Sequence, residues 1–213
     1  MDEAAVRRFA GAVTAGSGED QISLRPNGTY GRRLARAPLS TDAKDWTPRG
    51  TVLVTGGTGG VGANIARRLA GRGAEHLVLM SRRGGTSEEV TRLREELGVR
   101  VTIAACDVAD RDALAVVLAD LPDLTAVVHA AGIGAHSPIA ETDAAVFADA
   151  LAGKAIGAAN LDELLGDRPL DAFVLISSNA GVWGGGGQGA YAAANAYLDA
   201  LAERRRSRGR VAT

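Results

Sequence analysis

Four polar side chains in the second half of the sequence are of types that enzymes use for proton transfer: Lys154, Ser178, Tyr191 and Asn195. Tyr191 and Asn195 are four residues apart, so they share one face of a predicted helix. A phenol has a pKa of about 10 in water and transfers protons poorly at neutral pH unless a nearby cation stabilises the phenolate. Lys154 could supply that charge, Asn195 could hold the lysine or a relay water, and Ser178 could hydrogen bond to a substrate oxygen that becomes negative. Each residue also has a plainer interpretation: a tyrosine packing a helix, a serine ending a strand, a lysine in solvent.

A second chemical feature is the glycine-rich segment TGGTGGVG at 55–62. It follows a short apolar stretch, 51–54, and precedes a helical pattern from about residue 60, so it predicts a strand, a tight turn and a helix. Glycines leave room for a diphosphate, and the start of the helix offers it unpaired N–H groups. The spacing TGxxxGxG differs from GxGxxG, and no GxxxxGK[ST] is present, which excludes a P-loop. An ordinary loop is the alternative interpretation.

Charged residues follow two other predicted strands. Arg82 and Arg83 follow the second strand of the pattern, where the adenosine ribose of a dinucleotide would lie. Because arginine binds phosphate with two parallel hydrogen bonds, this pair favours NADPH over NADH. Asp107 follows the third strand and could accept a hydrogen bond from an adenine amine, or could merely cap a loop.

These residues need a scaffold, and the sequence predicts one by alternating strands with helices. Strands are expected at 51–54, 76–80, 99–104, 124–129 and 172–176, and helices from about 60, 87 and 110, over 142–165, and over 189–206. Such alternation predicts an α/β fold, a Rossmann-like doubly wound parallel sheet that binds ligands at the carboxyl ends of its strands.

Residues 1–50 differ in pattern from the rest. We expect an amphipathic helix over 1–16, strands at 21–25 and 30–34 joined by a turn at 26–28, and a linker over 35–50. The segment is too short to form an independent domain. It is predicted to be a small strand and helix appendage on the main body.

Composition narrows the class of protein. The net charge of −1 offers no basic excess for nucleic acid or an anionic membrane, and the apolar runs are short for a membrane span. No signal-peptide pattern stands at the start. One cysteine and three scattered histidines provide neither a disulfide framework nor a zinc-site spacing, so no metal is expected. We therefore expect a soluble, cytoplasmic protein.

Several motifs together resemble one family: TGGTGGVG (55–62), SRRG (81–84), CDV (106–108), HAAG (129–132), Lys154, SSNAGVWG (177–184) and YAAAN (191–195). The sequence over nearly all of 51–213 resembles the catalytic part of a ketoreductase domain from a modular type I polyketide synthase, within the short-chain dehydrogenase/reductase superfamily. Most of that superfamily has YxxxK with an upstream asparagine. Ketoreductase domains exchange these two positions, as Lys154 and Asn195 do here.

The resemblance implies a role for each site residue. Tyr191 would donate the proton to a ketone oxygen, Ser178 would orient that oxygen, and Lys154 and Asn195 would support the donor and its proton relay. NADPH would be the cofactor. Its binding residues would be the glycine-rich segment and the ends of the following strands: Thr55, Gly56, Gly57, Thr58, Gly59, Gly60, Val61, Gly62, Ser81, Arg82, Arg83, Cys106, Asp107, Val108, His129, Ala130, Ala131 and Gly132.

The resemblance also implies a substrate, a β-ketoacyl thioester carried on an acyl carrier protein, with neighbouring polyketide synthase domains as partners. B-type ketoreductases carry an LDD motif in the stretch corresponding to 132–137, and none is found here. A-type domains have the tryptophan seen at Trp183, and their epimerising subgroup has a histidine where Gln188 stands. The expected product is an L-β-hydroxyacyl thioester without α-epimerisation. Trp183 could alternatively be an aromatic residue of a lid loop.

The domain boundaries follow from the same resemblance. Residues 1–50 resemble the C-terminal remnant of the family's structural subdomain plus a linker, and 51–213 the catalytic NADPH-binding domain, with the family's C-terminal strands and lid absent from this chain. Two other functions remain open: a non-reducing scaffold, or pseudo-reductase, and a short-chain reductase that acts on free small ketones.

Overall fold

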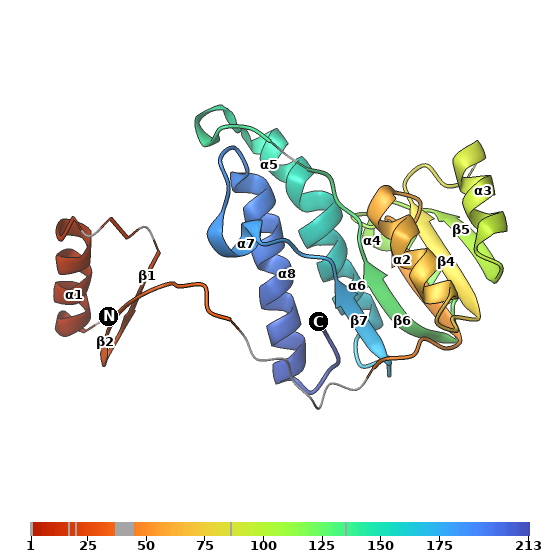
Figure 1. The fold of residues 1–213 in the computed structure, drawn as a ribbon, viewed down its shortest axis with the longest axis horizontal. Coiled ribbons are helices and arrows are strands. Elements are labelled where there is room, and N and C mark those ends of the chain that lie inside the picture. The colour runs from red at the N-terminus through yellow and green to blue at the C-terminus, as the bar shows by residue number, and fades with distance from the viewer. Residues whose placement is uncertain (1, 17, 20, 37–44, 86, 135) are drawn as a thin grey trace. The chain divides into compact units, whose positions relative to one another are not determined.

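The structure is a computed structural model that describes residues 2–16, 18–19, 21–36, 45–85, 87–134 and 136–213. It divides into two compact units, Met1–Lys44 and Asp45–Thr213. Figure 1 shows the helix and hairpin of the first unit and the sheet with its helices in the second. Each unit is described by itself below.

The first unit contains one helix and one hairpin. Helix α1 (Glu3–Thr14) begins after Asp2, whose carboxylate accepts a hydrogen bond from the Ala5 N–H at 2.6 Å. Strands β1 (Ile22–Arg25) and β2 (Gly28–Gly31) pair antiparallel. The second strand therefore begins and ends earlier than the predicted 30–34, because the turn occupies only the two residues before Gly28.

The second unit is built on a five-stranded, wholly parallel sheet. Its strands are β3 (Thr51–Thr55), β4 (His76–Ser81), β5 (Arg100–Ala105), β6 (Leu124–His129) and β7 (Ala172–Leu175). Their order in space is β5-β4-β3-β6-β7, so the chain winds outward from β3 in one direction and then in the other. This arrangement confirms the predicted Rossmann-like fold, in which ligands bind where the winding direction reverses, beyond the ends of β3 and β6.

Helices cover both faces of this sheet, because alternate strand residues point to opposite sides. Leu53 of β3 packs in the core with α4 (Arg111–Ala119), α6 (Gly157–Leu165) and α8 (Gly189–Ser207). Val52 and Val54 pack on the opposite face with α2 (Gly60–Ala70) and α3 (Glu88–Glu96). Figure 1 shows these two layers of helices.

Helix α2 carries apolar residues at four-residue intervals, Val61, Ile65 and Leu69, but only Leu69 of these three is buried. Val61 is exposed and Ile65 is only half-buried, whereas Gly62, Ala66 and Leu69 face the sheet. The first turn of α2 must approach the glycine turn closely, so small residues line its inner side. The larger Val61 side chain is consequently left on the outside.

The predicted helix over 142–165 consists of three segments. They are α5 (Ala144–Leu151), a π-helical turn named η2 (Ala152–Ile156) and α6. Together they form a stretch of 22 residues that contains an 18-residue window with a mean hydropathy of 1.2. By length and composition alone the stretch could cross a membrane, which the short apolar runs did not predict. Leu161 and Leu165 of this stretch belong to the buried core beside α4 and β7, as core helices of the same length do.

Residues 45–50, predicted as linker, pack with the second unit. The Trp46 ring packs against the core on the α2 side of the sheet, and Pro48 is buried. The Trp46 carbonyl accepts a hydrogen bond from Arg72 at 3.4 Å, and Arg49 forms an ion pair with Asp171 at 2.7 Å. The second unit therefore begins at least five residues before β3.

The buried charges of Asp162 and Arg205 and residues 211–213 lie close to β7. Arg205 of α8 donates to the Asp162 carboxylate at 2.5 Å and to the Val211 carbonyl at 3.1 Å, and it stacks 3.9 Å from the centre of the Phe173 ring. The Thr213 N–H donates to the Phe173 carbonyl at 3.0 Å, and the Thr213 carbonyl accepts from Leu175 at 2.7 Å. This pattern is that of a parallel pair beside β7.

Candidate active site

Lys154 and Tyr191 are brought together by two helical segments that pack against each other. Lys154 lies in the π-helical turn η2 and is only 6% exposed, and Tyr191 lies in the first turn of α8. The lysine Nζ is 5.6 Å from the centre of the tyrosine ring and donates a hydrogen bond to the Ile176 carbonyl, just after β7, at 2.8 Å. A cation held there stabilises negative charge on the phenol oxygen.

The charge of Lys154 is itself controlled by its surroundings. Burial lowers the pKa of Lys154, because a buried ammonium loses its hydration. The carboxylate of Asp199 acts in the opposite direction and raises the pKa. Asp199 follows Tyr191 and Asn195 at the same four-residue spacing along α8, so all three residues share one helix face.

Asn195 is completely buried beneath Tyr191. Its amide nitrogen donates to the Tyr191 carbonyl at 2.7 Å, which fixes the side chain along the axis of α8. Its Oδ1 has no hydrogen-bond partner in the described part of the chain. Since a buried amide oxygen normally accepts a hydrogen bond, this atom suits a water or an ammonium proton at the predicted relay position.

Ser178 follows β7 at the same end of the sheet and is half-buried. Its hydroxyl donates to the Asn179 side chain at 3.3 Å and accepts from the Ala180 N–H at 3.2 Å, at the start of α7 (Ala180–Trp183). Within the described residues no hydrogen bond joins Ser178 to Tyr191. The short helix α7 packs on α8, so the serine and the tyrosine are carried by adjoining elements.

A cavity of about 880 Å³ opens beyond the ends of β3, β4, β5 and β6. Most of the predicted cofactor residues line it: Thr55, Gly56, Thr58, Gly59, Gly60, Val61, Gly62, Ser81, Arg82, Arg83, Cys106, Asp107, Val108, Ala130, Ala131 and Gly132. Gly57 and His129 do not; both are buried behind its wall. The cavity is also lined by five residues that the sequence analysis missed, Met80, Ile133, Asp149, Ala152 and Gly153. The last three lie within about one helical turn of each other and of Lys154, a spacing that could have revealed them.

Two glycines make the floor of this cavity possible. Gly56 has a φ of +64°, and a Cβ there would lie 2.8 Å from the Ala130 carbonyl oxygen. A Cβ on Gly62 would lie 2.1 Å from the Gly56 oxygen, which no side chain can occupy. The glycine turn therefore lies directly on the first turn of α2, whose residues Gly60, Val61 and Gly62 line the cavity where a helix N-terminus offers unpaired N–H groups.

Charged groups in the cavity fit an adenine dinucleotide phosphate. Arg82 and Arg83 are exposed on its wall, and among the described residues neither forms an ion pair with a carboxylate. Two unpaired guanidinium groups are suited to bind a phosphate. Asp107 accepts a hydrogen bond from the Ala109 N–H at 3.0 Å, so the carboxylate also holds its own loop, as the plainer interpretation predicted.

Trp183 and Gln188 lie on either side of a glycine loop between α7 and α8. Trp183 ends α7 with its ring about half exposed, and Gln188 directly precedes α8. The loop is tied to the segment after β6 by a hydrogen bond from the Ser137 N–H to the Gly187 carbonyl, 2.7 Å long. Neither Trp183 nor Gln188 lines the cavity that contains the glycine turn.

Comparison with known proteins identifies what this arrangement is similar to. The family described as the KR domain matches residues 50–213. Polyketide synthase GfsA of Streptomyces halstedii is 55% identical over 98% of the chain, and the pikromycin polyketide synthase component PikAIII of Streptomyces venezuelae is 54% identical over all of it. A solved structure of A-type ketoreductases from a modular polyketide synthase is 52% identical, superposes with a TM-score of 0.90 and is matched by the whole chain.

The chain corresponds to only a part of each of these proteins. It spans 3% of the length of GfsA and 14% of PikAIII. It spans 47% of the chain in the solved A-type structure.

Proposed function

The chain belongs to the KR domain family, the ketoreductase domains of modular polyketide synthases, and from this membership we infer that it is an oxidoreductase that reduces a β-keto group with NADPH. The observation that carries this inference is the position of Lys154 Nζ, 5.6 Å from the Tyr191 ring, beside a cavity that fits a dinucleotide. Most short-chain reductases do not have the lysine and asparagine positions exchanged. Here both exchanged residues, Lys154 and Asn195, are buried around the tyrosine.

The chain's own residues would manage the proton. Tyr191 donates its phenolic proton to the ketone oxygen as that oxygen becomes negative, and Ser178 hydrogen bonds to the same oxygen. Lys154 stabilises the phenolate that remains, because its ammonium group is held close to the ring by the Ile176 carbonyl. The unpartnered Oδ1 of Asn195 holds the water or ammonium proton through which Tyr191 is reprotonated.

The cavity would hold the cofactor in one orientation. The glycine turn and the first turn of α2 bind the diphosphate, Arg82 binds the 2′-phosphate with Arg83 beside it, and Asp107 binds the adenine amine. When bound, NADPH supplies the hydride that reduces the β-carbon. An acidic residue at the position of Arg82 would instead favour the free 2′-hydroxyl of NADH.

We propose that the substrate is a β-ketoacyl thioester on an acyl carrier protein, delivered by neighbouring polyketide synthase domains. The resemblance to polyketide synthases supports this proposal. The absence of an LDD motif at 132–137, the half-exposed Trp183 and the similarity to A-type ketoreductases support an L-β-hydroxy product, and Gln188 supports retention of the α-centre without epimerisation.

The proposal is tested by incubating the chain with NADPH and an α-methyl-β-ketoacyl thioester and resolving the four product stereoisomers by chiral chromatography. We expect NADPH oxidation and a single L-β-hydroxy product with its α-centre unchanged. NADPH binding without oxidation would favour a pseudo-reductase. Equal turnover of carrier-bound thioester and small free ketones would favour a general short-chain reductase, and a D-hydroxy product would contradict the A-type assignment.

A further inference from the structure

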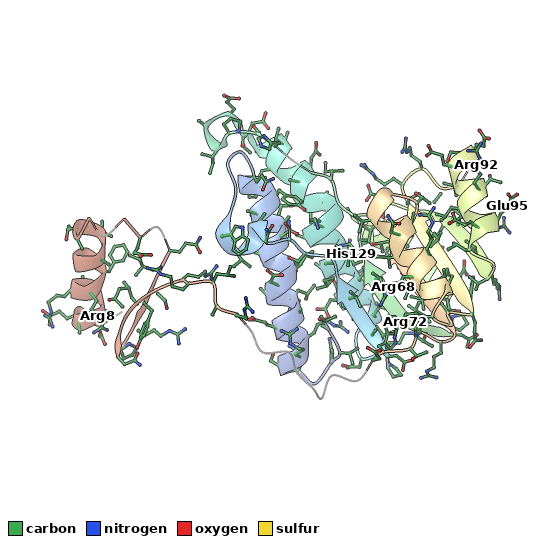
Figure 2. The ribbon with its side chains drawn as sticks, in the orientation of Figure 1. Arg8, Arg68, Arg72, Arg92, Glu95 and His129 are labelled. Carbon is green, nitrogen blue, oxygen red and sulfur yellow. The ribbon has the colours of Figure 1, made fainter. Side chains whose placement is uncertain are left out.

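His129 ends β6 in the interior of the second unit, and the cavity wall separates it from the cofactor site. Its side chain is completely buried, and Figure 2 labels it inside the unit, far from the peripheral residues Arg92 and Glu95 of α3. The sequence analysis assigned it to the cofactor. The structure places its ring between the end of β3 and the π-helical turn η2 instead.

Both ring nitrogens of His129 have partners. Nε2 is 2.9 Å from the Lys154 main-chain carbonyl oxygen, and Nδ1 is 2.7 Å from the Thr55 hydroxyl. A carbonyl oxygen can only accept, so Nε2 must carry the proton. Burial lowers the pKa of His129 to about 4, so the ring is neutral at physiological pH and its Nδ1 accepts from the Thr55 hydroxyl.

These contacts form one continuous chain of hydrogen bonds. The Ala131 N–H donates to Thr55 Oγ1 at 3.2 Å, Thr55 donates to His129, and His129 donates to the carbonyl of Lys154. The Lys154 ammonium group then donates to the Ile176 carbonyl. This series of hydrogen bonds thus connects the end of β3 with Ala131 in the cavity wall and with the main chain of Lys154.

The Lys154 carbonyl that accepts from His129 belongs to the π-helical turn η2. A π-helical turn adds one residue to the helix, widens its hydrogen-bond ladder and is less stable than the α-helical alternative. Restoring α-helical geometry over Ala152–Ile156 would rotate the residues after the turn about the helix axis by roughly 100° in total, the rotation of one residue, relative to the residues before it. Lys154 lies inside the turn and would take part in this rotation, which would change the direction of its side chain relative to Tyr191.

We propose that His129 is a positioning residue for the reduction: its Nε2–H fixes the Lys154 carbonyl and thereby holds the π-helical turn that directs the Lys154 ammonium group toward Tyr191. The proposal rests on the proposed function of Lys154 and Tyr191. It adds that one buried imidazole holds both the end of the strand that carries Thr55 and the main chain of the catalytic lysine.

The test uses two substitutions that distinguish the hydrogen bond of Nε2 from the hydrogen bond of Nδ1. His129→Gln places an amide nitrogen near the position of Nε2 and keeps a donor for the Lys154 carbonyl. His129→Asn is shorter and reaches Thr55 only. We expect the asparagine variant to lose about 100-fold in kcat, as misplacement of a catalytic group by about 1 Å does, with NADPH affinity unchanged, and the glutamine variant to recover most of that loss.

His76 provides a matched control. It also stands on a strand between two threonine hydroxyls, 3.2 Å from Thr51 and 2.9 Å from Thr102, but it begins β4 at the opposite end of the sheet. His76→Asn should leave kcat unchanged. Equal kcat in wild type and His129→Asn, or a parallel loss of NADPH affinity and kcat, would overturn the proposal.

A second measurement needs no variant. Nitrogen-15 NMR of labelled histidine in the wild-type chain reports the tautomer of His129, and we expect the Nε2–H form. An Nδ1–H form would contradict the proposal even if the variants failed to fold. Absence of turnover by the wild type would count against the proposed function instead, and the tautomer would still test the contact.

Discussion

The Lys154 ammonium nitrogen lies 5.6 Å from the centre of the Tyr191 ring although the two residues come from different helical segments. Tyr191→Phe removes the proton donor and leaves the ring in place. We expect kcat to fall by about 10²- to 10⁴-fold, the usual contribution of general acid catalysis, with NADPH affinity retained. Tyr197→Phe on the same helix is the control, since that ring packs against the core and should leave kcat unchanged.

Asp199 should set the alkaline limit of activity. Its carboxylate raises the pKa of Lys154 against the effect of burial, so Asp199→Asn lowers that pKa further. Lys154 then loses its proton at a lower pH, and the alkaline limb of the kcat profile should move to lower pH. Glu203→Gln, at an exposed position of the same helix, should leave the profile unchanged. If the alkaline limb of the kcat profile stayed at the same pH in Asp199→Asn, the titration of Lys154 would not be the cause of that limb.

Arg82 should discriminate between the two nicotinamide cofactors. Arg82→Ala removes a phosphate-binding fork and should weaken NADPH by about 1.5 to 3 kcal/mol, the range for hydrogen bonds to charged groups, while NADH changes little. The measurement is the Kd of each cofactor by titration. Arg92→Ala, on the periphery of the unit (Figure 2), is the control. Equal losses for both cofactors would remove the 2′-phosphate role.

His129 should make the folded state sensitive to acid. Its pKa is about 4 in the fold against an ordinary value of 6.5, so the unfolded chain takes up this proton first as the pH falls. Above pH 6.5 both states are neutral and the group has no effect. Between pH 6.5 and 4 the free energy of unfolding should fall by up to about 1.4 kcal/mol per pH unit from this residue. Urea unfolding of the wild type and of His129→Gln across this pH range measures the contribution of His129 to the free energy of unfolding. The variant should lack this pH-dependent loss.

The buried ion pair of Asp162 and Arg205 should contribute more to the free energy of unfolding than the exposed ion pairs nearby. Arg205 is 2% exposed, so Asp162→Asn leaves a buried guanidinium without its counter-charge. Breaking such a pair costs about 3 to 5 kcal/mol. Asp167→Asn removes an acid that is 91% exposed and should cost about 1 kcal/mol or less. Urea unfolding compares the two, and similar losses would contradict a special role for the buried pair.

Most of the fold was predictable because each strand of the sheet is a short apolar run bounded by glycine or polar residues. The predicted strands match β3 to β7 within about a residue at each end. The π-helical turn was not predictable, because it depends on Lys154 having tertiary partners on β6 and after β7. Periodicity also failed for Val61, because steric closeness to the glycine turn decides which side of α2 faces inward.

The candidate site was predictable where a residue acts through its own type and position. The glycine turn, Arg82 and Asp107 all line the cavity at strand ends, as α/β topology requires. The arrangement of His129 was not predictable, since Thr55 and Lys154 are far from it in the sequence and a histidine at a strand end is equally compatible with a ligand contact. Buried hydrogen-bond partners leave no periodic signal.

The attachment of residues 45–50 to the second unit has a practical consequence for recombining synthases. A graft of the catalytic unit that began at β3 would discard the ring of Trp46, the buried Pro48 and the Arg49–Asp171 pair, and would expose core side chains on the donor fragment. A junction placed before Asp45 keeps all three with the sheet they pack on. Chimeric enzymes joined at this earlier boundary should therefore yield more soluble protein than those joined at the first strand.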